Sequence, residues 1–199
     1  VTASHYRALA LDYGIEPQVD YRLILLGSTA LAYDSPLLEE VLNACAGAGP
    51  VGIIAAASSE PRSEAARYVR RLEEQGIASL DLRVTIDNIE RIGLDPELVG
   101  QIASLKTILL TGGNQIRLAE ALLHRGEVTP VLQALVEAYA AGATIIAVSG
   151  AAAALSGFMI AGGRSYEAMR FGIASDMGRR GLVIQEGLGL FGVGVVDQN

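Results

Sequence analysis

Short aliphatic runs alternate along the chain with longer segments in which apolar residues recur every three or four positions. The aliphatic runs predict strands, because they are short, continuous and bounded by turn-forming residues. We expect strands at 21–26, 51–57, 80–84, 107–110, 143–148 and 192–196. The spaced pattern predicts helices at 36–46, 62–75, 96–104, 116–123, 130–141 and 151–160.

This alternation of strands and helices predicts the fold class. Several of the strands are apolar throughout, which is typical of a parallel sheet covered by helices on both faces. No internal repeat and no long linker rich in Pro, Gly or Ser divides the chain. We therefore expect residues 1–199 to form a single α/β domain, a three-layer αβα sandwich with a mostly parallel sheet.

Composition narrows the functional classes. Hydrophobic residues make up 51% of the chain, enough to build a core, and the formal net charge of −7 disfavours nucleic acid and anionic membranes as partners. The single cysteine excludes a disulfide framework and a cysteine-rich zinc site. Residues 138–163 carry no charge, but serine-glycine pairs interrupt them, so we expect a buried strand and a helix there rather than a membrane span. Residues 1–11 lack a secretion-signal pattern, and the expected location is cytoplasmic.

Two loops follow predicted strands at the edge of the sheet where ligands bind in parallel folds, 111–115 and the pair Ser149-Gly150. A serine at a tight strand-to-helix turn, followed by small residues, fits a nucleophile elbow, in which the hydroxyl is exposed above the sheet. Gly113 in the neighbouring loop can supply a second N–H to an oxyanion. The alternative is that Ser149 only caps the helix that it precedes.

Five blocks of the sequence resemble one known family: 21–27, 57–61, 111–115, 147–156 and 187–198. They fall in the order and spacing of the cyanophycinase branch of the S51 serine peptidases. Typical stretches of that branch read T-A-S-S-E-P, T-G-G-N-Q, G-T-S-A-G-A-A-V-M-S and G-L-G-L followed by D-Q-H. The dipeptidase E branch is similar, but the pairs Asn114-Gln115 and Asp197-Gln198 are closer to cyanophycinase.

The resemblance implies a fold like that of class I glutamine amidotransferases, with serine in place of cysteine at the elbow. Ser149 matches the family nucleophile, and Gly113 and Gly150 match the oxyanion positions. The positions that match the substrate pocket are Gln115, Asp197 and Gln198, and we also expect Asn199 to bind substrate. The family hydrolyses bonds after β-linked aspartyl groups, as in the aspartate–arginine polymer cyanophycin, or removes N-terminal aspartate. It uses no metal and no cofactor, and its members often form dimers, so a homodimer is an expectation.

The sequence departs from the family pattern at two places that affect the chemistry. The elbow reads Ser149-Gly150-Ala151 where the family has Ser-Ala-Gly, and Asn199 stands where the family has its catalytic histidine. A serine hydroxyl is a weak nucleophile without an adjacent base. His5 and His124 are the only histidines, and the pattern places them on an N-terminal arm and at a helix end.

The family also continues beyond position 199, so its C-terminal part is not in this sequence. Three explanations stay open: a shortened or processed form, a natural non-catalytic homologue, or a substitution at position 199 that traps an inactive state. For the acid that orients a histidine, the candidates are Glu167 and Asp176, and each is also a plausible solvated carboxylate. Arg164 and Arg170 are the candidate partners of a substrate carboxylate.

The sequence therefore predicts a serine-type peptidase that resembles cyanophycinase and hydrolyses aspartyl or β-aspartyl bonds, including β-aspartyl-arginine. Ser149, Gly113, Gly150 and Glu167 are the predicted catalytic group. The alternative is a homologue that binds aspartyl peptides but has lost the chemistry with its histidine.

Overall fold

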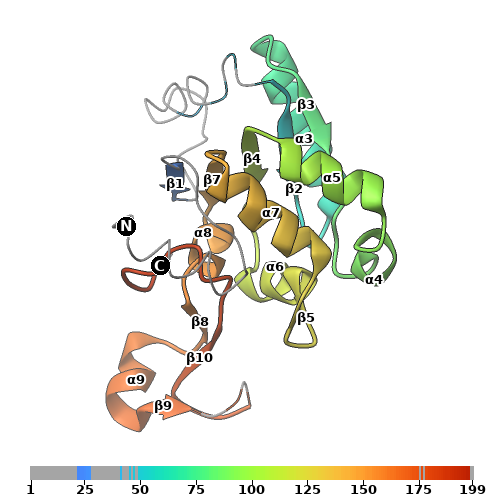
Figure 1. The fold of residues 1–199 in the computed structure, drawn as a ribbon. Helices are drawn as coiled ribbons and strands as arrows, with labels where there is room; N and C mark the ends of the chain where they lie inside the picture. Colours follow the sequence, from blue (N-terminus) through green and yellow to red (C-terminus); the bar gives the residue numbers. More distant parts are fainter. Residues whose placement is uncertain are drawn as a thin grey trace.

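The computed structural model describes residues 22–27, 41, 45, 47, 49–174, 176 and 178–197. Its centre is a five-stranded sheet in the order β1-β7-β4-β2-β3, and every neighbouring pair is parallel (Figure 1). The strands are β1 (Arg22–Leu26), β2 (Val51–Ile54), β3 (Ser79–Asp81), β4 (Thr107–Leu110) and β7 (Thr144–Val148). Because β7 and β4 are central, their carboxyl ends and the loops that follow them lie side by side.

Helices cover both faces of this sheet and separate the core into two parts. The helices on one face are α5 (Pro96–Ser104), α6 (Gln115–Leu122), α7 (Pro130–Ala140) and α8 (Gly150–Ala154). On the opposite face lie α3 (Pro61–Glu74) and the helical residues Val41 and Cys45. Successive strand residues point to alternate faces, so Ile108 packs in the first core and Leu109 in the second. The predicted three-layer sandwich is confirmed.

Local signals in the sequence mark the starts of several helices. Proline occupies the first turn of α3, α5 and α7, where its missing N–H costs nothing. The Asp95 carboxylate accepts hydrogen bonds from the N–H groups of Glu97 and Leu98, and the Thr129 hydroxyl accepts one from Leu132 N. Of the predicted helix at 36–46, only Val41 and Cys45 lie within the described residues, and both are helical.

The prediction fails in the last quarter of the chain. The expected helix 151–160 is wrong, since α8 stops at Ala154 and the chain continues as β8 (Phe158–Gly162). The expected strand 192–196 is also wrong, because residues 192–197 lie outside any strand, whereas the real strand is β10 (Leu182–Glu186). The helix has already ended before Ser156-Gly157. Burial alternates along β8, with Met159 and Ala161 inward, as is typical of a strand.

The segment 158–186 forms a small lobe that projects from the sandwich (Figure 1). Its three strands have the order β8-β10-β9, with β8 and β10 antiparallel. Helix α9 (Ser165–Phe171) and the short strand β9 (Ile173–Ala174) form its far end. The remaining elements are α4 (Ile89–Ile92) and the two-stranded hairpin β5 (Leu123–His124) and β6 (Glu127–Val128).

The uncharged run 138–163 is divided among the end of α7, β7, α8 and β8. Across the described part of the chain, none of the helices combines the length and the apolar character that crossing a membrane requires. As predicted, the run forms a buried strand, β7, and a short helix, α8, whereas its last residues form β8 in the lobe.

Candidate functional site

Ser149 occupies the turn between β7 and α8, at the carboxyl end of a central strand. Its backbone has φ 52° and ψ −120°, a conformation that residues with a Cβ rarely adopt. The Ser149 N–H donates to the carbonyl oxygen of Leu26 in β1 at 2.7 Å, which fixes the turn to the neighbouring strand. A strained serine at this point of the fold is the geometry of a nucleophile elbow.

The loop after β4 lies directly against this turn. A Cβ placed on Gly112 would lie 3.4 Å from the Ser149 Cβ, so the two loops are in van der Waals contact. A Cβ on Gly150 would overlap the carbonyl oxygen of Gly113. Residue 150 must therefore be glycine for the two loops to approach this closely, which explains the departure from the Ser-Ala-Gly order. The structure brings together Ser149, Gly150 and Gly113, as the sequence predicts.

Gly113 is itself fixed from the other side. Its φ is 147°, and a Cβ there would overlap the carbonyl group of Ala57 in the turn after β2. That same carbonyl oxygen accepts a hydrogen bond from Asn114 N at 2.9 Å. The ends of β2, β4 and β7 are thus tied together, and Gly150, as the first residue of α8, has an N–H without an intrahelical acceptor. Whether these N–H groups hold an oxyanion stays a prediction.

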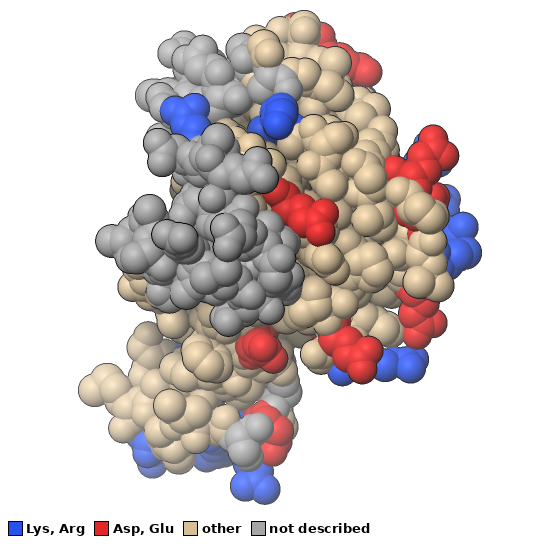
Figure 2. Space-filling view, in the orientation of Figure 1, with Lys and Arg blue, Asp and Glu red and all other residues tan. Residues whose placement is uncertain are grey.

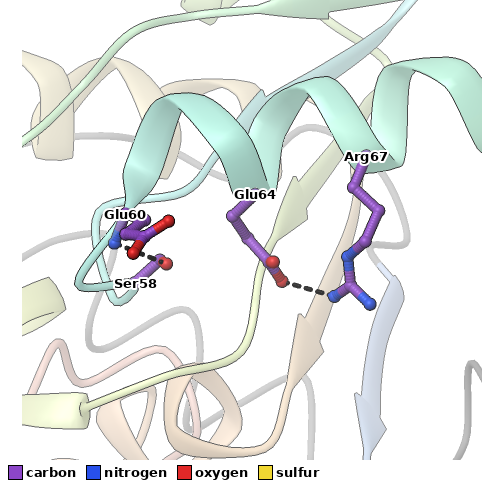
Figure 3. Close-up of polar contacts among 4 residues, drawn as sticks. All are labelled: Ser58, Glu60, Glu64 and Arg67. Carbon is purple, nitrogen blue, oxygen red and sulfur yellow. Dashed lines mark hydrogen bonds and ion pairs between the residues drawn. The ribbon is translucent and has the colours of Figure 1, made fainter.

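The turn after β2 contains Ser58, Ser59 and Glu60, which belong to the block 57–61 of the family resemblance. Figure 3 shows Ser58 and Glu60 at the start of α3. The Ser58 hydroxyl accepts a hydrogen bond from Glu60 N at 3.1 Å, and the Ser58 carbonyl accepts one from Arg117 Nε at 3.2 Å. Further along α3, Glu64 pairs with Arg67 at 2.7 Å on the surface. The two hydrogen bonds of Ser58 therefore shape the turn that leads into α3 and connect this turn to Arg117 of α6.

A cavity of about 270 Å³ lies near the elbow, although Ser149, Gly113 and Gly150 are not among the residues that line it. Its lining comes from the start of α6, the middle of α8, β8 and the C-terminal segment, and includes Gln115, Ala153 and Asp197. The Gln115 amide donates to the carbonyl oxygen of Ile160 at 2.7 Å, which orients this side chain along the cavity wall. Ala153 lies one helical turn beyond Ser149, and its N–H donates to the Ser149 carbonyl. Two of the predicted pocket residues, Gln115 and Asp197, thus line one cavity.

Sequence reasoning missed the residue that positions the Asp197 segment. Ser156 is fully buried, and its hydroxyl accepts a hydrogen bond from Val196 N at 2.9 Å. Ser156 also forms a β-bridge with Phe191. The available signal was a serine within an otherwise apolar run, because a buried hydroxyl needs a polar partner.

The structure does not join Glu167 to the elbow. Glu167 lies on α9 in the lobe, and its carboxylate accepts a hydrogen bond from Arg164 N at 3.0 Å, so that it caps its own helix. Asp176 pairs with Arg179 at 3.2 Å, also in the lobe. The Arg170 guanidinium donates to the Tyr166 hydroxyl. These contacts give each of these lobe side chains a local structural role.

Of the two histidines, His5 lies outside the described residues, as do Gln198 and Asn199. His124 lies in β5 rather than at a helix end, and its Nε2 is 3.0 Å from a carboxylate oxygen of Glu90. Arg125 shares that carboxylate at 3.0 Å. His124 therefore belongs to a surface cluster with Glu90 and Arg125, and it does not line the cavity near the elbow.

Cys45 is the other nucleophilic side chain to consider. It is buried against the α3 face of the sheet, and burial raises the pKa of its thiol from 9.0 to about 11. A thiol of this kind stays protonated at neutral pH, so Cys45 is packed as an inert core residue. In the described part of the chain, no three His, Cys, Asp or Glu side chains are grouped so that they could hold a metal ion.

Comparison with known proteins supports the fold. No protein-family model matches the sequence. A peptidase from an acI-B1 Actinobacterium shares 23% identity with a TM-score of 0.57, over 84% of this chain and 64% of its own length. A peptidase E protein of Listeria monocytogenes EGD-e, by its given name, shares 22% sequence identity with this chain. The two structures match with a TM-score of 0.52, over 86% of this chain and 75% of the other. The chain thus has the fold of these two proteins and spans less than two thirds of the first.

Proposed function

We propose that this chain carries the nucleophile half of a serine-type peptidase of the S51 type, with Ser149 as the attacking residue. The observation that carries the proposal is the positive φ of Ser149 at the end of β7. Strained backbone of this kind persists where the surroundings impose it, and it clusters at reacting groups. The names of both structural neighbours agree with this reaction class.

In this proposal the two glycine-bearing loops around Ser149 stabilise the developing oxyanion. Gly113 and Gly150 supply the N–H groups, because Gly150 directly follows the serine and the carbonyl group of Gly113 lies against Gly150. The Ser149 hydroxyl adds to the scissile carbonyl, its proton passes to a base, and the amine leaves with a proton. The cavity that Gln115 and Asp197 line is where the substrate side chain binds.

We infer an aspartyl or β-aspartyl peptide as substrate, with β-aspartyl-arginine the first compound to test. The support is the resemblance of the loops at 57–61, 111–115 and 147–156 to cyanophycinase, together with their placement around one elbow. The carboxylate of Asp197 at the cavity suits a cationic group of such a substrate, such as an amine or guanidinium.

The decisive experiment is labelling with a fluorophosphonate, read by intact-mass spectrometry. We expect one adduct on the wild-type chain and none on Ser149→Ala, because an elbow serine is more nucleophilic than a surface hydroxyl. Ser165→Ala is the matched control, since Ser165 lies exposed at the start of α9, and it should keep the adduct. An adduct that survives Ser149→Ala would contradict the proposal.

A second function is favoured by Asn199, which replaces the histidine of the family pattern. Without a base the chain would bind aspartyl peptides and turn them over poorly. Asn199→His should then raise hydrolysis of β-aspartyl-arginine by about 10²–10⁴-fold, the usual contribution of a positioned general base. If the wild-type chain hydrolyses the dipeptide and Asn199→His changes neither that rate nor the affinity by calorimetry, the second function is contradicted.

A further inference from the structure

Strand β8 leads from the sandwich into the lobe, and one of its edges has no strand beside it among the described residues. Figure 1 shows β8 and β10 running together from α8 to the lobe, and Figure 2 shows the lobe below the body of the molecule. In the three-stranded sheet β8 is an outer strand, and within the described part of the chain it pairs with β10 alone. The main-chain N–H and C=O groups along such an edge can pair with another extended chain.

The second half of β8 lines the cavity near the elbow. The lining includes four consecutive residues, Ile160, Ala161, Gly162 and Gly163. Three of them are alanine or glycine, so large side chains of their own do not screen this main chain from the cavity. At about 3.3 Å per residue, the stretch offers backbone groups over about 10 Å.

An amide group from outside the small sheet binds this edge. Gln115, at the start of α6, donates from its side-chain amide to the Ile160 carbonyl oxygen at 2.7 Å. The side-chain amide of glutamine offers the same kind of N–H donor as a peptide group. The Ile160 carbonyl is therefore directed toward α6 and the cavity, on the side where the backbone of a bound peptide would pair with β8.

A β-bulge lies in the same stretch of β8. The pairing passes from Ile160 opposite Ile184 to Gly162 opposite Val183, so Ala161 is an extra residue in β8. The extra residue of a bulge is left unpaired in the ladder, and bulges are frequent next to active sites. The register with β10 thus releases the main chain of β8 at a residue that lines the cavity.

The other walls of the cavity adjoin the two loops of the elbow. Asn114 lines the cavity and directly follows Gly113. Ala153 also lines it, and its N–H donates to the Ser149 carbonyl oxygen at 3.2 Å. A chain bound along β8 therefore lies in the same cavity as the residues that support the proposed nucleophile.

We propose that the open edge of β8 binds the main chain of an extended peptide substrate, which adds to the small sheet as a further strand. The inference rests on the proposed function, since it takes the cavity as the substrate site. In this mode of recognition main-chain hydrogen bonds supply affinity, and alternate side chains enter pockets. The substrate class is therefore a peptide of several residues rather than an isolated dipeptide.

Calorimetry on the Ser149→Ala chain, which leaves the peptide intact, tests this substrate class. The probes are the dipeptide Asp-Arg and two hexapeptides that extend it with Val-Thr-Val-Thr, one at its amino end and one at its carboxyl end. We expect one hexapeptide to bind at least about 10-fold more tightly than the dipeptide, because it forms further hydrogen bonds with β8. Equal affinity of the three peptides would overturn the inference.

Methylation of main-chain nitrogens in the tighter hexapeptide separates strand addition from recognition by side chains. Each methyl group removes one donor and leaves every side chain in place. Alternate residues of a strand turn their N–H groups to the same side, so affinity should fall about 3- to 10-fold at every second residue and stay unchanged between them. Losses without this alternation contradict strand addition.

Hydrogen exchange locates the peptide on the protein. With saturating hexapeptide, the main-chain amides of residues 158–163 should exchange at least about 10-fold more slowly. The matched control is β9, the opposite outer strand of the same sheet, whose residues Ile173 and Ala174 should keep their exchange rates. Protection of β1 or β3, the outer strands of the large sheet, in place of β8 would reject the proposed site.

The fluorophosphonate adduct at Ser149 distinguishes failure of this inference from failure of the proposed function. An adduct on the wild-type chain, with no gain in affinity from the longer peptides, rejects strand addition and retains the nucleophile. Absence of the adduct, with peptide-dependent protection of residues 158–163, rejects the peptidase and supports β8 as a peptide-binding edge.

Discussion

Ser149 and Gly150 each meet one structural requirement of the elbow, the first a strained backbone and the second space for the neighbouring loop. Ser149 carries the strained backbone, with φ 52°, while Gly150 provides the space that the Gly113 carbonyl occupies. Neither property follows from side-chain chemistry alone, because a serine that caps an ordinary helix has extended backbone. The Ser149 hydroxyl makes no capping hydrogen bond to α8, so the simple capping alternative does not describe this residue.

The close approach at Gly150 predicts a sharp contrast between two glycine substitutions. Gly150→Ala should lower the free energy of unfolding by about 1–3 kcal/mol, because its Cβ overlaps the backbone of the neighbouring loop. Gly100→Ala should raise it by about 0.5–1 kcal/mol, since Gly100 lies in α5 with open space around its Cβ. Urea denaturation measures both, and equal effects would contradict the contact at Gly150.

Burial of Cys45 predicts a pH effect with a definite sign. Its pKa is raised to about 11 in the folded chain, so the unfolded thiol ionises first as the pH rises above 9. The stability that comes from the neutral thiol is complete below pH 9 and is lost between pH 9 and 11. At pH 8.5 a thiol reagent should label the folded chain at least about 100-fold more slowly than the chain in urea, as two pKa units require. Comparable labelling rates would show that Cys45 is exposed.

The helix that begins beside the site, α6, depends on a cap with two functions. The Asn114 side chain accepts a hydrogen bond from Ile116 N at 2.8 Å, while its own N–H donates to Ala57. The first interaction begins the helix, and the second anchors it to the turn after β2. Together they place Gln115 where its amide reaches the Ile160 carbonyl.

Removing this cap should destabilise α6 and displace Gln115. Asn114→Ala is expected to lower the free energy of unfolding by about 1 kcal/mol, the usual value for loss of an N-cap. Asn114→Asp keeps the acceptor oxygen and adds a charge that favours a helix N-terminus, so it should retain the stability. Thermal unfolding of the two variants gives the comparison, and an equal loss in both would mean that the amide nitrogen matters instead.

At the level of the whole molecule, the sandwich and the lobe are built on different principles. The sandwich buries its strands on both faces, and β2, β4 and β7 are buried along their whole length. The lobe consists mainly of the antiparallel pair β8 and β10 and of helix α9, which has no buried residue. The lobe is therefore an appendage whose end contributes little to the core.

This division predicts that the end of the lobe can be removed. Gly163 lies so close to Gly181 that a Cβ on it would overlap the Gly181 carbonyl oxygen. Replacing residues 164–180 by Asn-Gly should close β8 and β10 with a tight turn and change the free energy of unfolding by no more than about 1 kcal/mol. Fluorophosphonate labelling of Ser149 should persist. Loss of cooperative urea unfolding would show that the lobe end is part of the core.

The sequence by itself determined the sandwich and the location of the elbow. Strand β4 matches the prediction at both ends. A continuous aliphatic run between a lysine and a threonine-glycine turn predicts a strand wherever it lies in a fold. Ser149, Gly113 and Gly150 were found for a similar reason, since loops at the carboxyl ends of neighbouring parallel strands must meet.

The secondary structure of the segment from Gly150 onward was decided only by the tertiary structure. Alanine and glycine have too little side chain to show a period, so local pattern could not tell that α8 ends at Ala154 and that Phe158 begins a strand. The strand forms because β10, more than twenty residues later, supplies its hydrogen-bonding partner. In the same way Glu167, predicted at the elbow, caps α9 in the lobe, because the course of β8 carries it away from Ser149.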